Sequence, residues 1–216
     1  VYKRQDTDNG GALASETIEL AAGEGSFQGN IMRDLFSLRP PAVGSLGVTA
    51  AECLLWMRTY TEEPGEDGFT TYGQAVPPFG LDDTITVGSE GVVAGFSVDD
   101  RTRSNLILQN TVADAAGTLL PVTVRVDALD RSGATVHQES YSLRAGEYLQ
   151  HNGFIIDYGL GTISGGALRV VVVDPPPETS SGGVLAVVSE VNGADVDGTN
   201  DGRLMPAQVV GFAPSP

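Results

Sequence analysis

Short stretches in which apolar and polar residues alternate recur along the chain and predict β-strands. The clearest stretch covers residues 122–128, where Val or Ala occupies every even-numbered position and Thr, Arg or Asp lies between them. Such alternation places one face of an antiparallel strand against a core and the other in water. The same reasoning predicts strands over residues 92–98, 106–108, 168–173 and 184–191, and a helical turn only near residues 31–36.

Turn sequences rich in Gly, Asp and Ser separate the predicted strands. They lie at residues 130–133, 144–146, 181–183 and 201–202, so the strands follow one another at intervals of roughly 8–12 residues. Many short strands at this spacing are typical of two antiparallel sheets packed face to face. The sequence therefore predicts an all-β protein with an antiparallel, immunoglobulin-like β-sandwich.

An internal repeat is the strongest organisational signal in the sequence. Residues 16–30 (ETIELAAGEGSFQGN) align with residues 139–152 (ESYSLRAGEYLQHN), with Glu, Leu and Ala-Gly-Glu matched at positions 123 residues apart. Further matches, some after a one-residue slip, join residues 28–30 to 150–152, 44–46 to 166–168 and 8–11 to 130–133. The alternative is that hairpins built on such a turn simply resemble one another.

The repeat predicts two regions of unequal completeness. Residues 81–216 hold one complete copy of the sandwich, whereas residues 1–80 hold the end of an earlier copy that lacks its first three strands. Residues 77–80 contain two prolines and suit an extended linker between the copies. A truncated sandwich leaves strand edges open, so we expect the first copy to be visibly incomplete or to lean on the second.

Residues 103–110 (RSNLILQN) and the last strands carry a resemblance to a known class of module. They resemble the R-x-N-L-x-L-x-N opening strand of tandem β-sandwich repeats in secreted bacterial multidomain proteins. The strand at 185–189, the loop around 197–201 and Pro206-Ala207 resemble the end of that repeat, although the loop here is longer. The resemblance covers residues 6–212 and implies a noncatalytic module on an exported protein.

Composition and charge exclude some partners. The 216 residues carry 12 Lys and Arg against 28 Asp and Glu, a net charge of −16, whereas nucleic-acid binding needs clustered cations. The longest aliphatic run, residues 170–173, is too short to span a bilayer, and the single cysteine excludes an internal disulfide framework. An acidic, lysine-poor surface suits an exported protein, with an acidic cytoplasmic protein as the alternative.

The first residues bear on localisation. Residues 1–5 (VYKRQ) contain the only lysine and form no readable leader peptide. We interpret them as the edge of a fragment, with a processed mature terminus as the alternative, and expect an extracellular or cell-surface protein.

The residues that usually carry catalysis are few and isolated. His137 and His151 lie in or at the end of predicted strands, and no nucleophile elbow, phosphate-binding loop or H-E-x-x-H motif accompanies them. Cys53 lies in the apolar segment 52–56, which predicts a buried structural thiol. Most acidic residues alternate with apolar ones or occupy turns, which is typical of a solvated face rather than of a glycosidase pair. We expect no enzyme activity.

One acidic loop is a candidate calcium site. Gly198 and Gly202 allow the backbone to wrap around an ion, and Ca²⁺ prefers six to eight oxygen ligands from such a loop. The candidate ligands are Asp195, Asp197, Thr199, Asn200 and Asp201. The EF-hand pattern fails because Pro206 stands where its closing Glu belongs. The alternative is a loop whose Asp and Gly residues only form turns.

The only tryptophan belongs to a candidate partner surface. Trp56, Arg58 and Tyr60 share one face of an extended segment, a combination typical of a protein-binding hot spot and of a sugar-stacking platform. A Trp between Leu55 and Met57 is also typical of a core, and this alternative stays open.

These observations together predict a noncatalytic extracellular module that spaces, displays or mediates contact within a larger secreted bacterial protein. We expect it to be monomeric within that parent chain, with a protein or a glycan as partner. The alternative function is a carbohydrate-binding module. Ca²⁺ is the one cofactor for which the sequence offers ligands.

Overall fold

Antiparallel strands make up most of the regular structure. The computed structural model describes residues 2–6, 12–38, 44–50, 53–65, 68–99, 102–179, 181–192 and 202–211. Within these ranges the other regular elements are helix α1 (Ile31–Asp34), helix α2 (Phe154–Asp157) and the 3-10 turn η1 (Leu81–Asp83). The all-β prediction is confirmed.

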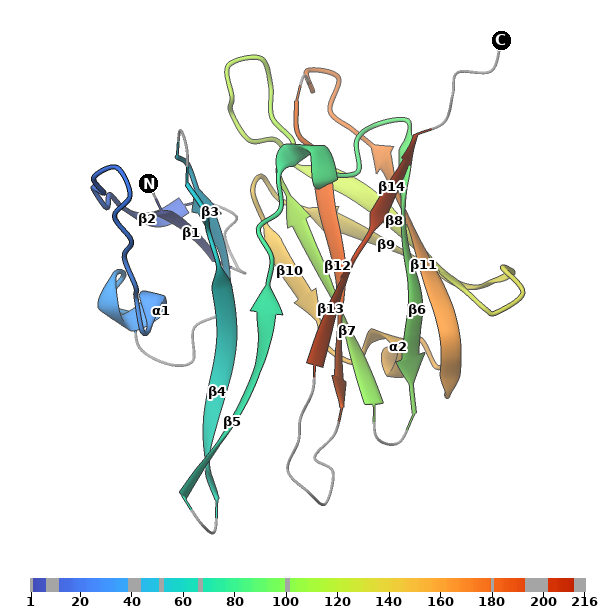
Figure 1. Cartoon of the computed structure of the whole chain (residues 1–216). Helices are drawn as coiled ribbons and strands as arrows, with labels where there is room; N and C mark the ends of the chain where they lie inside the picture. Colours follow the sequence, from blue (N-terminus) through green and yellow to red (C-terminus); the bar gives the residue numbers. More distant parts are fainter. Residues whose placement is uncertain are drawn as a thin grey trace.

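Two facing antiparallel sheets form a sandwich in the C-terminal part of the chain (Figure 1). One sheet consists, in order, of β10 (Tyr148–His151), β7 (Thr102–Asn110), β12 (Val184–Asn192) and β13 (Gly202–Pro206). The other consists, in order, of β14 (Gln208–Gly211), β6 (Ser89–Val98), β11 (Ile163–Asp174), β8 (Val122–Leu129) and β9 (Thr135–Leu143). Every strand predicted from alternation lies within one of these strands.

The pairing of the strands is immunoglobulin-like at its centre. With β6 to β12 lettered A to G, β7 pairs with β10 and β8 with β11, which are the B–E and C–F pairs of that fold. The outer strands are arranged differently, because β6 pairs with β11 and β12 pairs with β7. The sandwich therefore keeps the central pairs while its first and last strands lie in exchanged sheets.

The core lies between the two sheets. The alternation in β8 directs Val124 and Val126 inward, where both are fully buried, and Leu106 and Leu108 of β7 meet them from the opposite sheet. A tilted contact between two aromatic rings adds to this core at the end near α2, where the Phe96 and Phe154 centroids lie 5.9 Å apart. Burial of this apolar surface is the main contribution to the stability of the sandwich.

Two asparagines of the R-x-N-L-x-L-x-N segment secure turns around the core. The Nδ2 of Asn110 donates to the carbonyls of Leu120 (2.8 Å) and Arg144 (2.7 Å), and its Oδ1 accepts from the N–H of Val112 (2.9 Å). The Oδ1 of Asn105 accepts from the backbone N–H that precedes α2 (3.1 Å). Both asparagines are buried, so these bonds supply the partners that buried polar groups require.

The remaining strands form two small sheets beside the sandwich (Figure 1). One contains, in order, β2 (Ala12–Glu16), β1 (Tyr2–Asp6) and β3 (Gly44–Val48), and the other pairs β4 (Met57–Gly65) with β5 (Gly68–Val76). The predicted helical turn is confirmed as α1, whose N-cap Asn30 accepts from the N–H of Arg33 at 3.0 Å. We call residues 2–76 the first unit and residues 85–211 the second unit.

Three strands of the first unit repeat the pairing of three strands in the second. β1 lies between β2 and β3 as β8 lies between β9 and β11, and a register shift in the β1–β2 ladder matches one in the β8–β9 ladder. The matching pairs are Tyr2–Val48 with Val126–Val170, Lys3–Gly47 with Asp127–Arg169, Arg4–Leu46 with Ala128–Leu168, and Gln5–Ser45 with Leu129–Ala167. The two units therefore share topology and register over these strands.

The aligned Ala-Gly-Glu segments form the same turn. The N–H of Glu24 donates to the carbonyl of Ala21 (3.0 Å), and the N–H of Ala21 donates to the Glu24 carboxylate (2.8 Å). The equivalent bonds join Glu147 to Arg144 at 3.1 Å and 2.6 Å. The third residue of each turn is a glycine with positive φ, +79° and +68°, which favours glycine. The short helices α1 and α2 then follow at corresponding places.

The two units differ where the second uses β6 and β7. The sequence predicted that the first copy lacks its first three strands, but β1 occupies the place of β8, so the strands missing from the start of the described first unit are the counterparts of β6 and β7. The segment after the turn at 21–24 is not a strand. Its equivalent in the second unit, β10, pairs with β7 alone, which explains why no strand forms there.

Candidate functional site

The structure describes most of the tryptophan segment but not the candidate ligands of the acidic loop. Asp195, Asp197, Thr199, Asn200 and Asp201 all lie outside the described residues, so the calcium site stays a prediction. Among the described residues, no group of three or more His, Cys, Asp or Glu side chains is placed to hold a metal ion.

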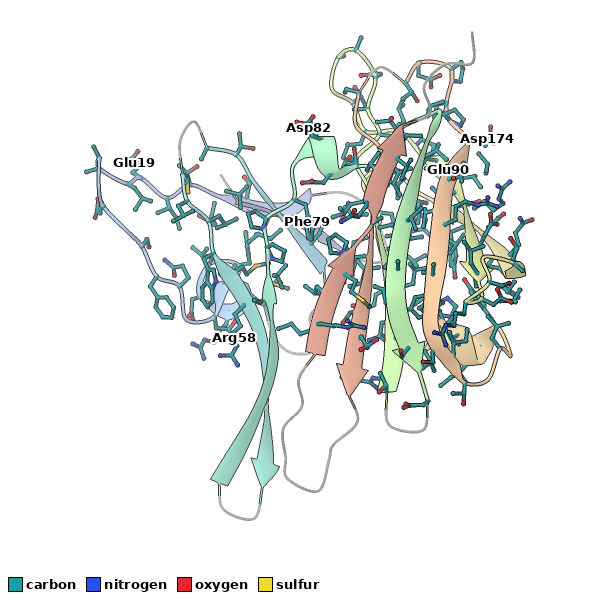
Figure 2. All side chains as sticks on the ribbon, turned by 45° about the vertical axis from the view of Figure 1, so that its right-hand side comes forward. Glu19, Arg58, Phe79, Asp82, Glu90 and Asp174 are labelled. Carbon is teal, nitrogen blue, oxygen red and sulfur yellow. The ribbon has the colours of Figure 1, made fainter. Side chains whose placement is uncertain are left out.

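The tryptophan segment lies on the surface. Trp56 is 73% exposed, so the interpretation of this residue as core is wrong. Arg58 is also exposed and points away from the sandwich in Figure 2. Tyr60 lies in β4, two residues further along the same face, and its side chain is outside the described residues. The structure thus exposes Trp56 and Arg58 together at the start of the β4–β5 hairpin.

The prediction of a buried structural cysteine is also wrong. Cys53 is exposed, and residues 53–56 are not part of a strand, because β4 begins only at Met57. In the second unit the start of β12 is held by its ladder with β7. The described first unit has no counterpart of β7, so its apolar segment has no such ladder to fold against.

The exposed Trp56 occupies a position that is covered in the second unit. Extending the β4–β5 register by one residue sets Trp56 opposite Pro77, as Val187 of β12 is set opposite Pro206 of β13. Val187 is 3% exposed although it does not belong to the core between the sheets. Two residues further along the same face of β12, the Ser189 hydroxyl donates to Gln74 of β5. This face of the second unit therefore contacts the first unit, whereas Trp56 on the equivalent face of the first unit is exposed.

The contact between β5 and β12 is polar. The Ser189 hydroxyl donates to Gln74 Oε1 (3.2 Å), and Gln74 Nε2 donates to the carbonyl of Glu190 (3.3 Å). The Glu190 carboxylate accepts from Arg203 on β13 (3.1 Å) and from the N–H of Ser97 on β6 (2.9 Å). We call these residues the junction; they tie the edge of the first unit to both sheets of the second.

A cluster of histidines and tyrosines lies at the open edge of the sandwich between β9, β10 and α2. The His151 Nε2 lies 2.7 Å from the Asp157 carboxylate, and its Nδ1 lies 2.8 Å from the Tyr141 hydroxyl. The Tyr141 hydroxyl also contacts that of Tyr158, on whose ring His137 stacks with a centroid distance of 4.0 Å. His137 and His151 are isolated from other catalytic residue types in the sequence, but the fold brings both to Tyr158.

The surroundings of the two tyrosines in this cluster keep their hydroxyls protonated. Burial is the main cause that raises the pKa of Tyr158 and of Tyr141, and the nearby Glu139 and Asp157 carboxylates add to it. The two ring nitrogens of His151 thus connect the Asp157 carboxylate with the Tyr141 hydroxyl, which also contacts the Tyr158 hydroxyl. The order Asp, His, hydroxyl is that of a nucleophilic triad, but a phenol whose pKa is raised is a poor nucleophile. The contacts of the cluster join β9, β10 and α2.

The amino-acid sequence predicts only part of this cluster. His137, Glu139 and Tyr141 alternate along one strand, which predicts a shared face, but nothing local connects that face with α2. The first unit does not repeat the cluster, since the residues equivalent to His137, Tyr141 and His151 are Ala14, Ile18 and Gly29.

A buried carboxylate lies on the outer face of the larger sheet. Asp127 is fully buried, its Oδ2 accepts from Arg169 (2.6 Å) and its Oδ1 from Gln138 (2.8 Å), and Arg125 Nε lies 3.1 Å away. Burial opposes ionisation, but the bonds from Arg169 and Gln138 and the charges of both arginines outweigh it and hold the pKa of Asp127 below its ordinary value. This cluster joins β8, β9 and β11.

A shallow hollow lies at the α2 end of the sandwich, lined by Val98, Asp99, Ile156, Gly159, Gly161 and Thr162. Backbone and aliphatic groups predominate among its walls.

None of the helices in the described ranges is long and apolar enough to cross a membrane.

Comparison with known proteins gives little beyond these observations. No protein-family model and no curated protein matches the chain. Among solved structures, the crystal structure of Thermotoga maritima 1070 is similar over 57% of this chain and 96% of that chain, with 10% identity and a TM-score of 0.42. A similarity of this size carries no argument about function.

Proposed function

We propose that the chain is a noncatalytic extracellular module that spaces or displays other parts of a larger secreted bacterial protein through stacking of consecutive β-sandwich repeats. The shared topology, register and turn of the two units support a repeat. The resemblance of residues 103–110 to tandem secreted modules and the acidic, lysine-poor composition support export.

The junction is the observation that carries this proposal. On the outer face of β12 in the second unit, Val187 is buried and Ser189 hydrogen-bonds to Gln74 of β5 in the unit before it. In the first unit, the equivalent face at Trp56 and Arg58 is exposed. If every pair of consecutive units met in this way, the units would stack in one direction. The contact uses the β12-type face of the later unit and leaves the equivalent face of the earlier unit free for a further unit.

Backbone ¹⁵N relaxation of the intact chain tests the spacing role. The hydrogen bonds from Gln74 should give the amides of residues 74–76 the same rotational correlation time as the amides of β12. Gln74→Ala should shorten the correlation time of β5, whereas the matched variant Gln28→Ala, away from the junction, should leave it unchanged. Independent tumbling of β5 and β12 in the wild type would contradict a spacing role.

The exposure of Trp56 favours carbohydrate binding as a second candidate function. A tryptophan that is 73% exposed offers its ring face for stacking on a sugar. Binding on a glycan array that Trp56→Ala abolishes would support this role. Phe27→Ala is the matched control, since Phe27 is an exposed aromatic residue of the same unit away from the β4 face. Equal loss in both variants, or no binding by the wild type, would exclude a Trp56 sugar site.

A further inference from the structure

We propose that the first unit is an acceptor for a β-hairpin, whose first strand pairs with β3 and whose second strand pairs with β4. The occupant is a polypeptide hairpin with the pattern of β6–β7: apolar residues on alternate positions and an asparagine at the end of its second strand. This inference rests on the proposed repeat and adds the kind of partner that completes it.

The strand order defines the two backbone edges of the acceptor. In the second unit, β11 lies between β8 and β6, and β12 lies between β13 and β7. As far as the structure describes the chain, β3 is the last strand of its sheet beyond β1, and β4 has a ladder with β5 alone. In the second unit, the hairpin β6–β7 therefore adds one strand to each sheet, β6 beside β11 and β7 beside β12. The equivalent strands of the first unit, β3 and β4, have no described strand on that side. Edges of this kind recruit strands by β-augmentation.

The apolar side chains that β6 and β7 cover in the second unit are partly exposed in the first. Among the first-unit side chains whose burial the structure describes, Phe36 is the one buried hydrophobic residue. Five pairs of positions are equivalent, and each is given with the first-unit residue first. The aligned sequences match Leu20 with Leu143, and the starts of α1 and α2 match Ile31 with Phe154 and Met32 with Ile155. The ladders match Leu46 with Leu168 and Val48 with Val170. The second members are at most 1% exposed, whereas Leu20 is 45% exposed and the others are intermediate. The first unit thus has half of a sandwich core.

A polar contact specifies the end of the hairpin. In the second unit, the carbonyls of the 144–147 turn accept from the side chains of Asn110 (2.7 Å) and Gln109 (3.1 Å), and Glu147 accepts from the N–H of Asn110 (2.9 Å). The turn at 21–24 has the same internal bonds and therefore presents equivalent carbonyls. An asparagine at the position of Asn110 is the complement that this turn selects.

The occupant is consequently a hairpin of this repeat type rather than a single strand or a flat apolar surface. One strand would satisfy β3 or β4 but not both, since the two belong to different sheets. A second copy of this chain is a poor occupant, because its own β6 and β7 are already paired on both sides of the sandwich core. The test below separates these possibilities.

The experiment supplies the hairpin to the full chain. A second copy of residues 89–110 is fused ahead of residue 1 through a flexible Gly-Ser linker, and amide hydrogen exchange is followed by mass spectrometry. Protection of β3 and β4 should increase on the order of 100-fold, while β11 and β12 keep the protection they have in the unfused chain. Unchanged exchange in β3 and β4 would overturn the proposal.

Variants of the added hairpin distinguish specific docking from a fusion artefact. In the second unit Val93 faces the core and the adjacent Ala94 is exposed, so Val93→Asp in the added copy should abolish the gain and Ala94→Asp should preserve it. Asn110→Ala in the added copy should reduce the gain without abolishing it. Equal effects of Val93→Asp and Ala94→Asp would overturn the proposal.

Sedimentation and hydrogen exchange of the unfused chain test whether a second copy of the chain fills the acceptor. If it sediments as a dimer with β3 and β4 already protected, a second copy fills the acceptor and the proposal is overturned. The spacing role fails independently of this result, since it is read from the correlation times of β5 and β12 and not from exchange in β3 and β4.

Discussion

The first and second units carry the same strand-turn-helix-strand arrangement, but among the side chains that the structure describes only those of the second unit form a core. Both have the same β-ladder register, the same Ala-Gly-Glu type of turn and a short helix after it. The second unit adds β6 and β7, and the residues equivalent to Leu46 and Val48 become fully buried. Local hydrogen bonds therefore suffice to define the turn and the pairing, whereas burial requires both sheets of the sandwich.

The comparison also separates general features from features of one unit. The turn at 21–24 and that at 144–147 are shared, so they belong to the repeat. The Tyr141–His151 cluster and the Asp127 cluster occur in the second unit only, since Lys3 and Gly47 stand at the positions of Asp127 and Arg169. Features of one unit add stability or specificity there without being needed for the fold.

The largest expected difference between the units is the cost of the same truncation at equivalent positions. Leu168→Ala removes a fully buried side chain and should lower the free energy of unfolding by about 2–5 kcal/mol. Leu46→Ala, at the equivalent and partly exposed position, should cost about 1 kcal/mol or less. Urea unfolding followed by circular dichroism measures both. Equal costs would show that the first unit has a core of its own.

Removing the asparagine that secures the second unit should have the next largest effect. Asn110→Ala leaves the Leu120 carbonyl and the Val112 N–H without their side-chain partner and should cost about 2–3 kcal/mol. Asn152→Ala is the matched control, because the Asn152 side chain accepts only from the exposed Gln150. Similar destabilisation by both variants would mean that the turn contacts of Asn110 contribute little.

The Asp127 cluster should make the second unit sensitive to acid. Because the pKa of Asp127 is lowered in the folded state, its contribution is present above its ordinary value of 3.8 and is lost as the pH falls through the lower, folded-state value. Asp127→Asn should cost about 1–2 kcal/mol at pH 7, since the paired arginines are partly solvated, and the difference from wild type should disappear in strong acid.

Unfolding at several pH values tests this expectation. Asp174→Asn, a change of the same kind at an exposed position of β11, should have no such pH-dependent effect. A difference between wild type and Asp127→Asn that persists unchanged below pH 3 would contradict the role assigned to the carboxylate.

The smallest expected effect concerns the acidic loop at residues 195–201. If Asp197 and Asp201 bind Ca²⁺, added calcium should raise the melting temperature of the second unit by a few degrees, in proportion to the logarithm of its concentration. Asp197→Asn should remove the increase, and Mg²⁺ should not reproduce it. An unchanged melting temperature at millimolar calcium would leave the loop as a set of turns.

Sequence reasoning succeeded where the signal is local. Alternation identified the strands of the second unit, Asn30 and the residues after it identified α1, and the matched Ala-Gly-Glu segments do form one kind of turn. It left Trp56 open between surface and core, and it failed for Cys53, whose apolar neighbours predicted burial. An apolar segment is buried only when another strand covers it, and the strand that does so in the second unit, β7, is remote in sequence.

The sequence by itself determined the all-β character, the strand positions and the turn chemistry, because each depends on residues within a few positions of one another. Only the tertiary structure decided which apolar faces are covered, and it alone brought Gln74 to Ser189 and His151 to Tyr141 and Asp157. These contacts depend on how sheets pack, and packing is fixed by side chains far apart in the chain.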